Sequence, residues 1–381
     1  MKQSDIRTWI EIDKTALHGN VEQFFRLMPE KIRFMAVVKS NAYGHGLVLT
    51  AKLLSEFWQK KKSERELWFG VDSITEALRL RREGITVPIL VLGYTLPSRI
   101  PEAVEGNITL TISQFENLKA IAALKKRPAI HIKIDTGMHR QGFFPSEVSK
   151  LIHFLKKYGI QPQGIYTHFA AAKDPTAPAY TMRQFAAFMN VVGGFEEAGY
   201  DGFVRHAAAS GATLLFPQTH LDMVRVGMAM YGSWPSREAA WSEGAERVSL
   251  EPVLSWKTVV GEIKTIPSGS FIGYDGTERT ARRTRMAVMP IGYWHGYDRG
   301  LSSVGEVLIR GRRSRILGRV SMDMIVADVT GILGVRVGDE VVLIGAAGRE
   351  RMSAEELAQK INTTAYEVLT RINPLIRRII V

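Results

Sequence analysis

The chain has 381 residues, of which 45% are hydrophobic and 23% charged, and 50 Lys and Arg against 38 Asp and Glu give a formal net charge of +12. This length exceeds what one compact core usually supports, so we expect two domains. The absence of cysteine excludes a disulfide framework, a thiolate metal site and a cysteine nucleophile. No stretch approaches the roughly 18 apolar residues of a membrane span, and the start of the chain does not resemble a secretory signal. We therefore expect a cytoplasmic protein that does not enter a membrane.

Short apolar runs rich in β-branched residues alternate with amphipathic segments through the first 230 or so residues. The eight strand candidates are Arg33–Lys39, Leu67–Val71, Val87–Leu92, Asn107–Ile112, Ala129–Asp135, Gly164–His168, Phe203–Ala207 and Asp222–Val226. Helical patterns lie between several of them, at Leu47–Gln59, Ile74–Arg82, Gln114–Leu124, Ser146–Tyr158 and Tyr180–Ala198. This α/β alternation predicts an N-terminal (β/α)8 TIM-like barrel over residues 1–245. A doubly wound sheet is the alternative, but no glycine-rich dinucleotide loop follows the first strand.

The remaining residues, 246–381, predict a C-terminal, mostly β domain. Its strand candidates are Leu254–Ile266, Met286–Ile291, Glu306–Ile309, Ser314–Val320, Met324–Val329 and Glu340–Ile344. Only Ser353–Leu369 has a helical pattern, and Ser353 with Glu356 predicts a capping box at its start. The opening strand candidate, Thr8–Ile12, is not one of the eight, and we expect it to pair with the C-terminal sheet.

Nine arginines lie between Arg282 and Arg319, opposed only by Asp298 and Glu306. One interpretation is a groove that follows a nucleic-acid backbone. The other is a set of solvated strand faces, with one or two arginines serving a small anionic ligand. No nucleic-acid-binding motif accompanies these residues, so we favour the second interpretation and expect no nucleic-acid partner.

Active residues of such barrels lie at the carboxyl ends of the strands. The residues read at these ends are Lys39, Arg140, His168, Ser210 and Arg225 with Gly227. The set is cationic and has no carboxylate cluster, so it suits an anionic cofactor or substrate better than a metal ion, and we expect no metal.

Lys39 follows the apolar run Ala36–Val38 and precedes a segment rich in small residues. A lysine in this place can be partly desolvated, which makes it a usable amine nucleophile. Taken alone, it could equally be an ordinary lysine where a strand meets solvent.

The string around this lysine, AVVKSNAYGHG, closely resembles the cofactor-lysine signature of alanine racemases, the barrel-fold group of pyridoxal 5′-phosphate enzymes. Further segments in both predicted domains resemble the family in the same order: WIEIDKTALHGNV near the start, IKIDTGMHRQGF, YTHFA, HAAAS, MVRVGMAMYG, GYDGT, IGYWHGY, GRVSMD and AYEV. Several separated motifs in order are far more specific than any single one, and the resemblance spans essentially the whole chain.

The resemblance implies that Lys39 carries the cofactor covalently and is one catalytic base, while Tyr274 of the partner subunit in a homodimer is the other. Arg225 would bind the pyridine nitrogen, with His168 linking it to the tyrosine. The full set of cofactor-binding residues it implies is Lys39, Tyr43, His168, Ser210, Arg225, Gly227, Met228 and Tyr366. Arg140 and the backbone of Met322 would bind the substrate carboxylate, and Lys133 matches a position that is carbamylated in some members.

The chemistry of racemisation agrees with these roles. A proton must leave one face of the α-carbon and another must arrive at the opposite face, so two bases have to flank it. An arginine at the pyridine nitrogen resists giving it a proton, because a guanidinium stays charged. This weakens the cofactor as an electron sink and should suppress transamination. Without the resemblance, Tyr274 would read as a solvent-exposed turn aromatic, and we assign no role to His206.

The sequence also departs from the common family pattern, at His139, Lys173, Ala209 and Ser321. These departures leave the proton-transfer residues in place but put strict alanine preference in doubt. We predict a pyridoxal-phosphate-dependent racemase that interconverts L- and D-alanine and supplies D-alanine for peptidoglycan. The alternatives are a serine or broad-specificity racemase, a barrel-fold decarboxylase, and a non-catalytic pyridoxal-phosphate-binding protein.

Overall fold

The computed structural model describes residues 6–61, 64–242, 246 and 248–381. The chain forms two compact units. The first, the barrel unit, comprises Ala16–Ala42 and Leu47–Glu251, and the second, the β unit, comprises Pro252–Val381, Tyr43–Gly46 and the described N-terminal residues up to Thr15. The domain boundary predicted at residue 245 lies outside the described residues.

Eight parallel strands form the sheet of the barrel unit. They are β2 (Arg33–Val37), β3 (Leu67–Val71), β4 (Ile89–Val91), β5 (Thr109–Ile112), β6 (Ile130–Lys133), β7 (Gly164–Tyr166), β8 (Val204–His206) and β9 (Met223–Val226). Neighbours follow chain order from β8 back to β2, and β9 then pairs with β2. A bridge from Ala209 to Arg225 joins the segments of β8 and β9, so the barrel is nearly closed. The predicted fold class is confirmed, and the doubly wound alternative is excluded.

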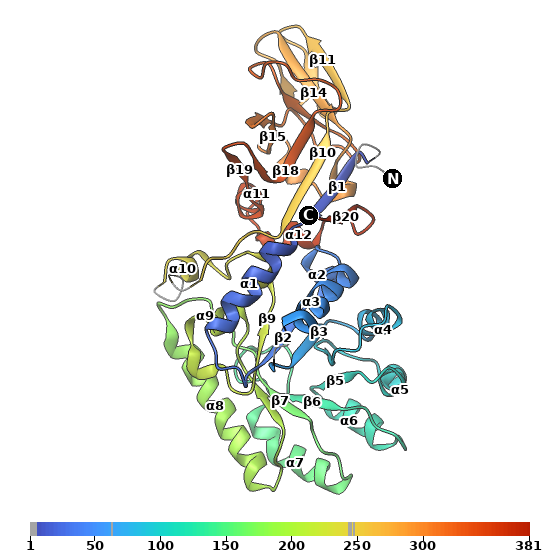
Figure 1. The fold of residues 1–381 in the computed structure, drawn as a ribbon, viewed down its shortest axis with the longest axis vertical. Coiled ribbons are helices and arrows are strands. Elements are labelled where there is room, and N and C mark those ends of the chain that lie inside the picture. The colour runs from blue at the N-terminus through green and yellow to red at the C-terminus, as the bar shows by residue number, and fades with distance from the viewer. Residues whose placement is uncertain (1–5, 62–63, 243–245, 247) are drawn as a thin grey trace. The chain divides into compact units, whose positions relative to one another are not determined.

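Helices on the outer side of these strands cover the barrel (Figure 1). They include α3 (Leu47–Lys61), α4 (Ile74–Arg82), α5 (Ile100–Glu105), α6 (Phe115–Ala122), α7 (Val148–Lys157) and α8 (Pro178–Glu197). The helix α1 (Lys14–Arg26) precedes β2 in the chain. The helix α9 (Ser210–Leu215) precedes β9, and α10 (Arg237–Ala240) follows it. The strands are buried on both faces, as in other parallel sheets, which explains their near-continuous apolar sequences. The carboxyl ends of the strands therefore provide the polar surface of this unit at which a site can form.

The β unit contains a seven-stranded sheet, a three-stranded sheet and a two-stranded ribbon. The strands are β1 (Thr8–Ile12), β10 (Leu254–Val259), β11 (Glu262–Ile266), β12 (Phe271–Ile272), β13 (Glu278–Arg279), β14 (Thr284–Met289), β15 (Glu306–Ile309), β16 (Arg312–Arg315), β17 (Ile325–Asp328), β18 (Glu340–Ala347), β19 (Glu350–Met352) and β20 (Arg377–Ile380). As expected, β1 belongs to this sheet: it is antiparallel to β10 and parallel to β20.

Three expectations for the β unit need correction. The strand predicted over Ser314–Val320 is β16, which begins at Arg312 and ends at Arg315. The single helix predicted over Ser353–Leu369 is two helices, α11 (Ala354–Lys360) and α12 (Ala365–Thr370), because the chain turns at Asn362, whose φ is 54°. The single strand predicted over Leu254–Ile266 is likewise divided into β10 and β11. Ser353 does cap α11, since its hydroxyl accepts the N–H of Glu356 at 3.1 Å.

The arginine-rich segment pairs with acidic residues from distant parts of the β unit. Arg313 binds the carboxylates of Glu306, Glu350 and Glu356, and Arg315 binds that of Glu278 at 2.7 Å. Further pairs join Arg310 to Asp339, Arg319 to Asp275 and Arg282 to Asp328. Much of this positive charge is therefore used in ion pairs on strand faces.

Candidate active site

A left-handed turn follows the first barrel strand and carries Lys39. The turn, α2 (Lys39–Tyr43), has φ values of 54°, 56°, 52° and 51° at its last four residues, none of them glycine. Such backbone is costly for L-residues and persists only when the surroundings hold it. The side chain of Lys39 is about one-third exposed, and its Nζ lies 3.7 Å from Oδ1 of Asp72.

Glu76 in α4 holds this turn in place. Its Oε1 accepts the backbone N–H of Ser40 at 2.8 Å, and its Oε2 accepts that of Asp72 at 2.8 Å. One carboxylate thus connects the ends of β2 and β3 and fixes both Lys39 and its partner Asp72. Glu76 was not among the predicted site residues, because its position as the third residue after the N-cap Ser73 gives no indication of this role.

We expect Glu76→Ala to destabilise the barrel unit by about 2 kcal/mol, because a carboxylate accepting backbone N–H groups makes charge-assisted hydrogen bonds. The urea unfolding midpoint measures this change. Glu83→Ala removes a surface partner of Lys52 near the end of the same helix and should have less than about 1 kcal/mol of effect. Equal effects of the two substitutions would contradict a special role for Glu76.

Arg225 in β9 is the most constrained cation of the barrel mouth. Its guanidinium is 3% exposed, and it donates from Nη1 to Nδ1 of His206 at 2.9 Å. Nη2 donates to the carbonyl oxygens of Thr167 and Ala207 at 2.8 and 2.9 Å, and lies 3.3 Å from Nδ1 of His168. Burial lowers the pKa of Arg225 to about 10, so it remains charged at neutral pH.

Lys133 in β6 lies in the same positive field. It is 6% exposed, and its Nζ donates to Oε1 of Gln141 at 3.1 Å. Burial, followed by the charges of Arg140 and Arg225, lowers the pKa of Lys133 to about 8. Burial and the same two arginines also hold the pKa of His168 well below its usual value, and Lys39 contributes to both shifts. The structure thus brings together five predicted residues: Lys39, Lys133, Arg140, His168 and Arg225.

Asp135 fixes the loop that carries Arg140. Its carboxylate accepts backbone N–H groups from Gly137, His139 and Arg140 at 2.9, 2.9 and 3.0 Å. These bonds hold the pKa of Asp135 below its usual value against the opposing effect of burial. These contacts give Asp135 a structural role in the loop.

Ser210 and Gly227, two predicted cofactor-binding residues of the barrel unit, also lie together. The hydroxyl of Ser210, the first residue of α9, accepts the backbone N–H of Gly227 at 3.0 Å. Gly227 directly precedes the short helical turn Met228–Tyr231. This hydrogen bond holds the hydroxyl of Ser210 and the start of the turn side by side at the ends of β8 and β9.

The β unit places Tyr43 next to Tyr366, with ring centroids 6.1 Å apart in an edge-to-face arrangement. Gly44 makes this approach possible: its φ is +90°, and a Cβ there would lie 2.1 Å from the carbonyl oxygen of Leu369. Arg378 in β20 binds the carbonyl oxygen of Gly44 at 2.9 Å. Tyr43 and Tyr366, both predicted to bind the cofactor, are thus held by one packed region of the β unit.

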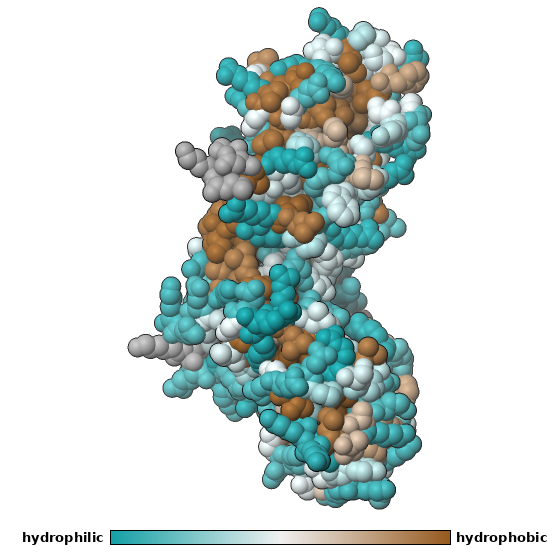
Figure 2. Space-filling model, turned by 90° about the vertical axis from the view of Figure 1, so that its right-hand side faces the viewer, coloured by the Kyte–Doolittle hydropathy of each residue, from teal (hydrophilic) through white to brown (hydrophobic). Residues whose placement is uncertain are grey.

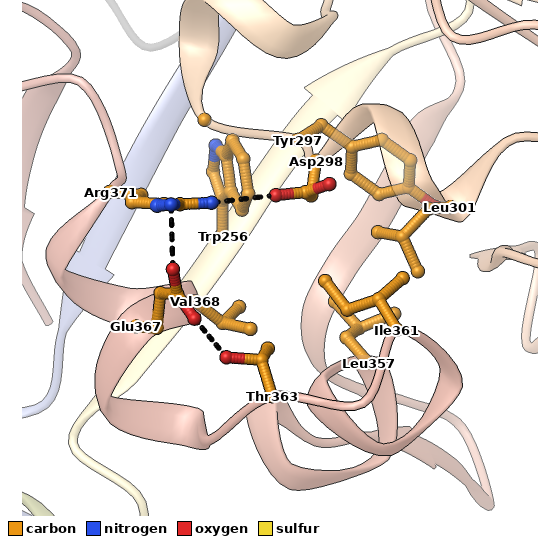
Figure 3. Close-up of a pocket in the computed structure, with 11 residues that line it drawn as sticks. Trp256, Tyr297, Asp298, Leu301, Leu357, Ile361, Thr363, Glu367, Val368 and Arg371 are labelled. Atoms are coloured by element: carbon orange, nitrogen blue, oxygen red, sulfur yellow. Dashed lines mark hydrogen bonds and ion pairs between the residues drawn. The ribbon is translucent and has the colours of Figure 1, made fainter.

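A pocket of the β unit explains how α12, which carries Tyr366, is held. Trp256, Tyr297, Leu301 and other apolar residues line it (Figure 3). At its rim Arg371 binds Asp298 at 3.0 Å and Glu367 at 2.6 Å, and Glu367 also accepts from Thr363. This chain of polar contacts connects α12 to the segment after β14.

Tyr274 and Met322 are both exposed on the β unit, at 68% and 54%. Tyr274 starts a short helical turn after Gly273, whose φ is 73°. The carbonyl oxygen of Met322 accepts the N–H of Trp294 at 3.0 Å, which connects two loops of this unit. In Figure 2, apolar residues are exposed on the face of the β unit that is turned toward the viewer.

His206 and His131 form a hydrogen-bonded pair inside the barrel, and the sequence analysis assigned a role to neither. A signal was available in the sequence: residues two apart in a strand share a face, so His131 lies on the same face of β6 as Lys133.

Within the residues that the structure describes, no group of three or more His, Cys, Asp or Glu could hold a metal ion. None of the described helices is long and apolar enough to cross a membrane.

The fold and the site define an α/β-barrel protein with a β unit and a cationic mouth suited to an anionic ligand. The alanine racemase N-terminal domain family matches residues 12–235, and its C-terminal domain family matches residues 253–380. The chain therefore belongs to the alanine racemase family, whose enzymes are isomerases.

Relatives and solved structures match along nearly the whole chain. Alanine racemase of Leptospira interrogans is 38% identical over 98% of this chain and 96% of its own, and that of Methanococcus maripaludis is 40% identical over 97% and 98%. The crystal structure of alanine racemase from Bacillus anthracis with bound L-Ala-P superposes with a TM-score of 0.90 at 36% identity, covering 99% of this chain and 95% of that one.

Proposed function

We propose that this protein interconverts L- and D-alanine with pyridoxal 5′-phosphate as cofactor and works as a homodimer with shared sites. The observation that carries the proposal is the buried guanidinium of Arg225, which shares one electrostatic field with Lys39 and Lys133 at the barrel mouth. In a bacterial cell, the product D-alanine would serve peptidoglycan synthesis.

The residues present fit the proposed cofactor. In the described part of the chain no protein acceptor binds Nε of Arg225, so a donor remains for a ring nitrogen. Ser210, Gly227 and Met228 of the barrel unit, with the hydroxyls of Tyr43 and Tyr366, would hold the phosphate, and Lys39 would bind the cofactor covalently. When bound, pyridoxal phosphate withdraws electrons from the α-carbon and so acidifies its proton.

The protein's own residues would then move and place protons. Nζ of Lys39 and the hydroxyl of Tyr274 from the partner subunit would exchange protons with opposite faces of the α-carbon. Arg225 donates a hydrogen bond but, being charged at neutral pH, gives up no proton. Arg140, aimed by Asp135, and the backbone of Met322 would bind the substrate carboxylate.

Exposed apolar side chains on the β unit support the homodimer. Tyr293, Trp294, Met322 and Met324 are between 43% and 59% exposed, and two backbone hydrogen bonds connect the loops that carry them. Clusters of this kind usually mark protein contacts. Light scattering after size exclusion should therefore give twice the chain mass of 42.6 kDa.

Lys133 is expected to carry a carbamate. Only a neutral amine attacks carbon dioxide, and a pKa of about 8 leaves roughly a tenth of the Lys133 side chains neutral at pH 7. With 13C-bicarbonate, NMR should show a carbamate carbon whose signal grows as the pH rises toward 8. The signal should vanish in Lys133→Gln and persist in Lys257→Gln, because Glu11 and Glu340 keep the pKa of Lys257 raised. A signal in Lys133→Gln would contradict the assignment.

The deciding experiment is chiral chromatography after separate incubation with L-alanine and L-serine in the presence of added pyridoxal phosphate. D-alanine as the dominant product supports the proposal. Comparable or greater D-serine would make the enzyme a serine or broad-specificity racemase, to which His139, Lys173, Ala209 and Ser321 would then contribute. Carbon dioxide release without racemisation would favour a decarboxylase, and no turnover at all would leave a cofactor-binding protein.

A further inference from the structure

A buried pair of histidines lies behind Arg225. Nη1 of Arg225 lies 2.9 Å from Nδ1 of His206, and Nε2 of His206 lies 2.8 Å from Nδ1 of His131. Both rings are 0% exposed. The three side chains come from β9, β8 and β6, so this row of hydrogen bonds crosses the inside of the barrel.

The donor and acceptor at each link are determined by chemistry. A guanidinium is only a donor, so Nδ1 of His206 must be unprotonated and its proton must sit on Nε2. That N–H in turn requires an unprotonated Nδ1 on His131, which places the proton of His131 on its Nε2. Both rings are therefore neutral and share one tautomer. Burial and then the charge of Arg225 lower the pKa of His131 to about 3 and that of His206 well below its usual value.

The surroundings hold the two rings tightly. Tyr166 stacks on His206 with centroids 4.5 Å apart and planes at 10°, and its hydroxyl is 2.9 Å from that of Thr111. A Cβ at Gly164 would lie 2.6 Å from the ring of His131, so this ring fits only opposite a glycine.

The row ends at Nε2 of His131, which is buried and has no protein partner within the described residues. The opposite tautomers would place N–H against N–H at Arg225, so this arrangement alone presents an acceptor to the arginine. A carboxylate at position 206 would also accept, but it would neutralise the charge of Arg225, whereas a neutral ring does not.

We propose that His206 and His131 are positioning residues: a neutral pair with one fixed tautomer that orients the guanidinium of Arg225 and leaves its positive charge to the ligand. The identity of the ligand's ring nitrogen rests on the proposed function. The tautomers of the pair do not.

The first test measures the tautomers directly, in the full-length holoenzyme labelled with 15N at its nine histidines. Ring-nitrogen NMR at neutral pH should show two histidines with protonated Nε2 and unprotonated Nδ1 whose N–H protons exchange slowly. His131→Asn and His206→Asn assign these signals. A protonated Nδ1 on either ring, or a doubly protonated ring, would overturn the proposal, whatever substrate the protein uses.

The second test reads the orientation of Arg225 through a side reaction. In transamination the amino group of alanine passes to the cofactor, water is consumed and the keto acid leaves. A misplaced Arg225 guanidinium should permit more transamination. His131→Leu removes the acceptor of His206, and we expect the ratio of transamination to racemisation to rise about tenfold, the effect of one lost hydrogen bond. The absorbance of the amine form of the cofactor and chiral chromatography give the two rates.

Two further variants make this result specific. His131→Asn keeps an acceptor at the position of Nδ1 and should stay within about threefold of the unsubstituted protein. His220→Leu removes another buried histidine, whose Nε2 lies 2.9 Å from the carbonyl oxygen of Thr213, and should not change the ratio. An unchanged ratio in His131→Leu, or an equal rise in His220→Leu, would overturn the proposal. If the unsubstituted protein racemises no alanine, the proposed function fails, and the tautomer measurement alone decides on the pair.

Discussion

Tyr274→Phe is expected to lower alanine racemisation by about 1,000-fold while the cofactor stays bound, because the substitution removes only the hydroxyl that would exchange a proton with one face of the α-carbon. Chiral chromatography measures the loss, and cofactor absorbance checks binding. Tyr158→Phe changes another exposed tyrosine, on the barrel unit, and should leave the rate unchanged. Full activity of Tyr274→Phe would exclude the tyrosine as a base.

Mixing two inactive variants tests the shared site. After subunit exchange, half of the dimers formed by Lys39→Ala and Tyr274→Phe proteins are mixed, and each mixed dimer contains one site with neither substitution if the two bases come from different subunits. About a quarter of the full activity should therefore return. Each variant exchanged with itself should stay inactive. A mixture that also stays inactive would place both bases on one subunit.

Arg225→Leu is expected to destabilise the barrel unit by about 3–5 kcal/mol, because the acceptors on His206, Thr167 and Ala207 would be left buried without a donor. The urea unfolding midpoint measures the loss. Arg205→Leu is the matched control: this arginine on β8 is one-third exposed and paired with Asp222, so its removal should cost about 1 kcal/mol or less. Similar losses would show that the buried arginine contributes no more than a surface ion pair.

Much of the fold could be predicted from the sequence, because buried parallel strands have apolar sequences that stand out between amphipathic helices. All eight barrel strands and the pairing of Thr8–Ile12 with the C-terminal sheet are as predicted. The break between α11 and α12 was not predicted from the apolar pattern: it depends on positive φ at Asn362, and asparagine is, after glycine, a common residue at such a helix end. Apolar periodicity continues through such a turn and gives no sign of it.

The candidate site, too, could be predicted from the sequence only in part. The ends of the strands identify Lys39, His168 and Arg225, because these residues directly follow or end apolar runs. Glu76 and His206 act through groups far from them in sequence, a backbone N–H in one case and a guanidinium in the other. Only the folded chain brings these partners together, so spacing along the sequence does not reveal them.

The position of β1 has a consequence for synthesis of the chain. This strand lies between β10 and β20, and the hydroxyls of Thr8 and Thr258 are 3.0 Å apart. A ribosome makes β1 about 250 residues before β10 and about 370 residues before β20. Until both neighbours have been made, this apolar strand has no partner in the sheet. It is exposed to chaperones and to aggregation during that time, and the β unit is completed late.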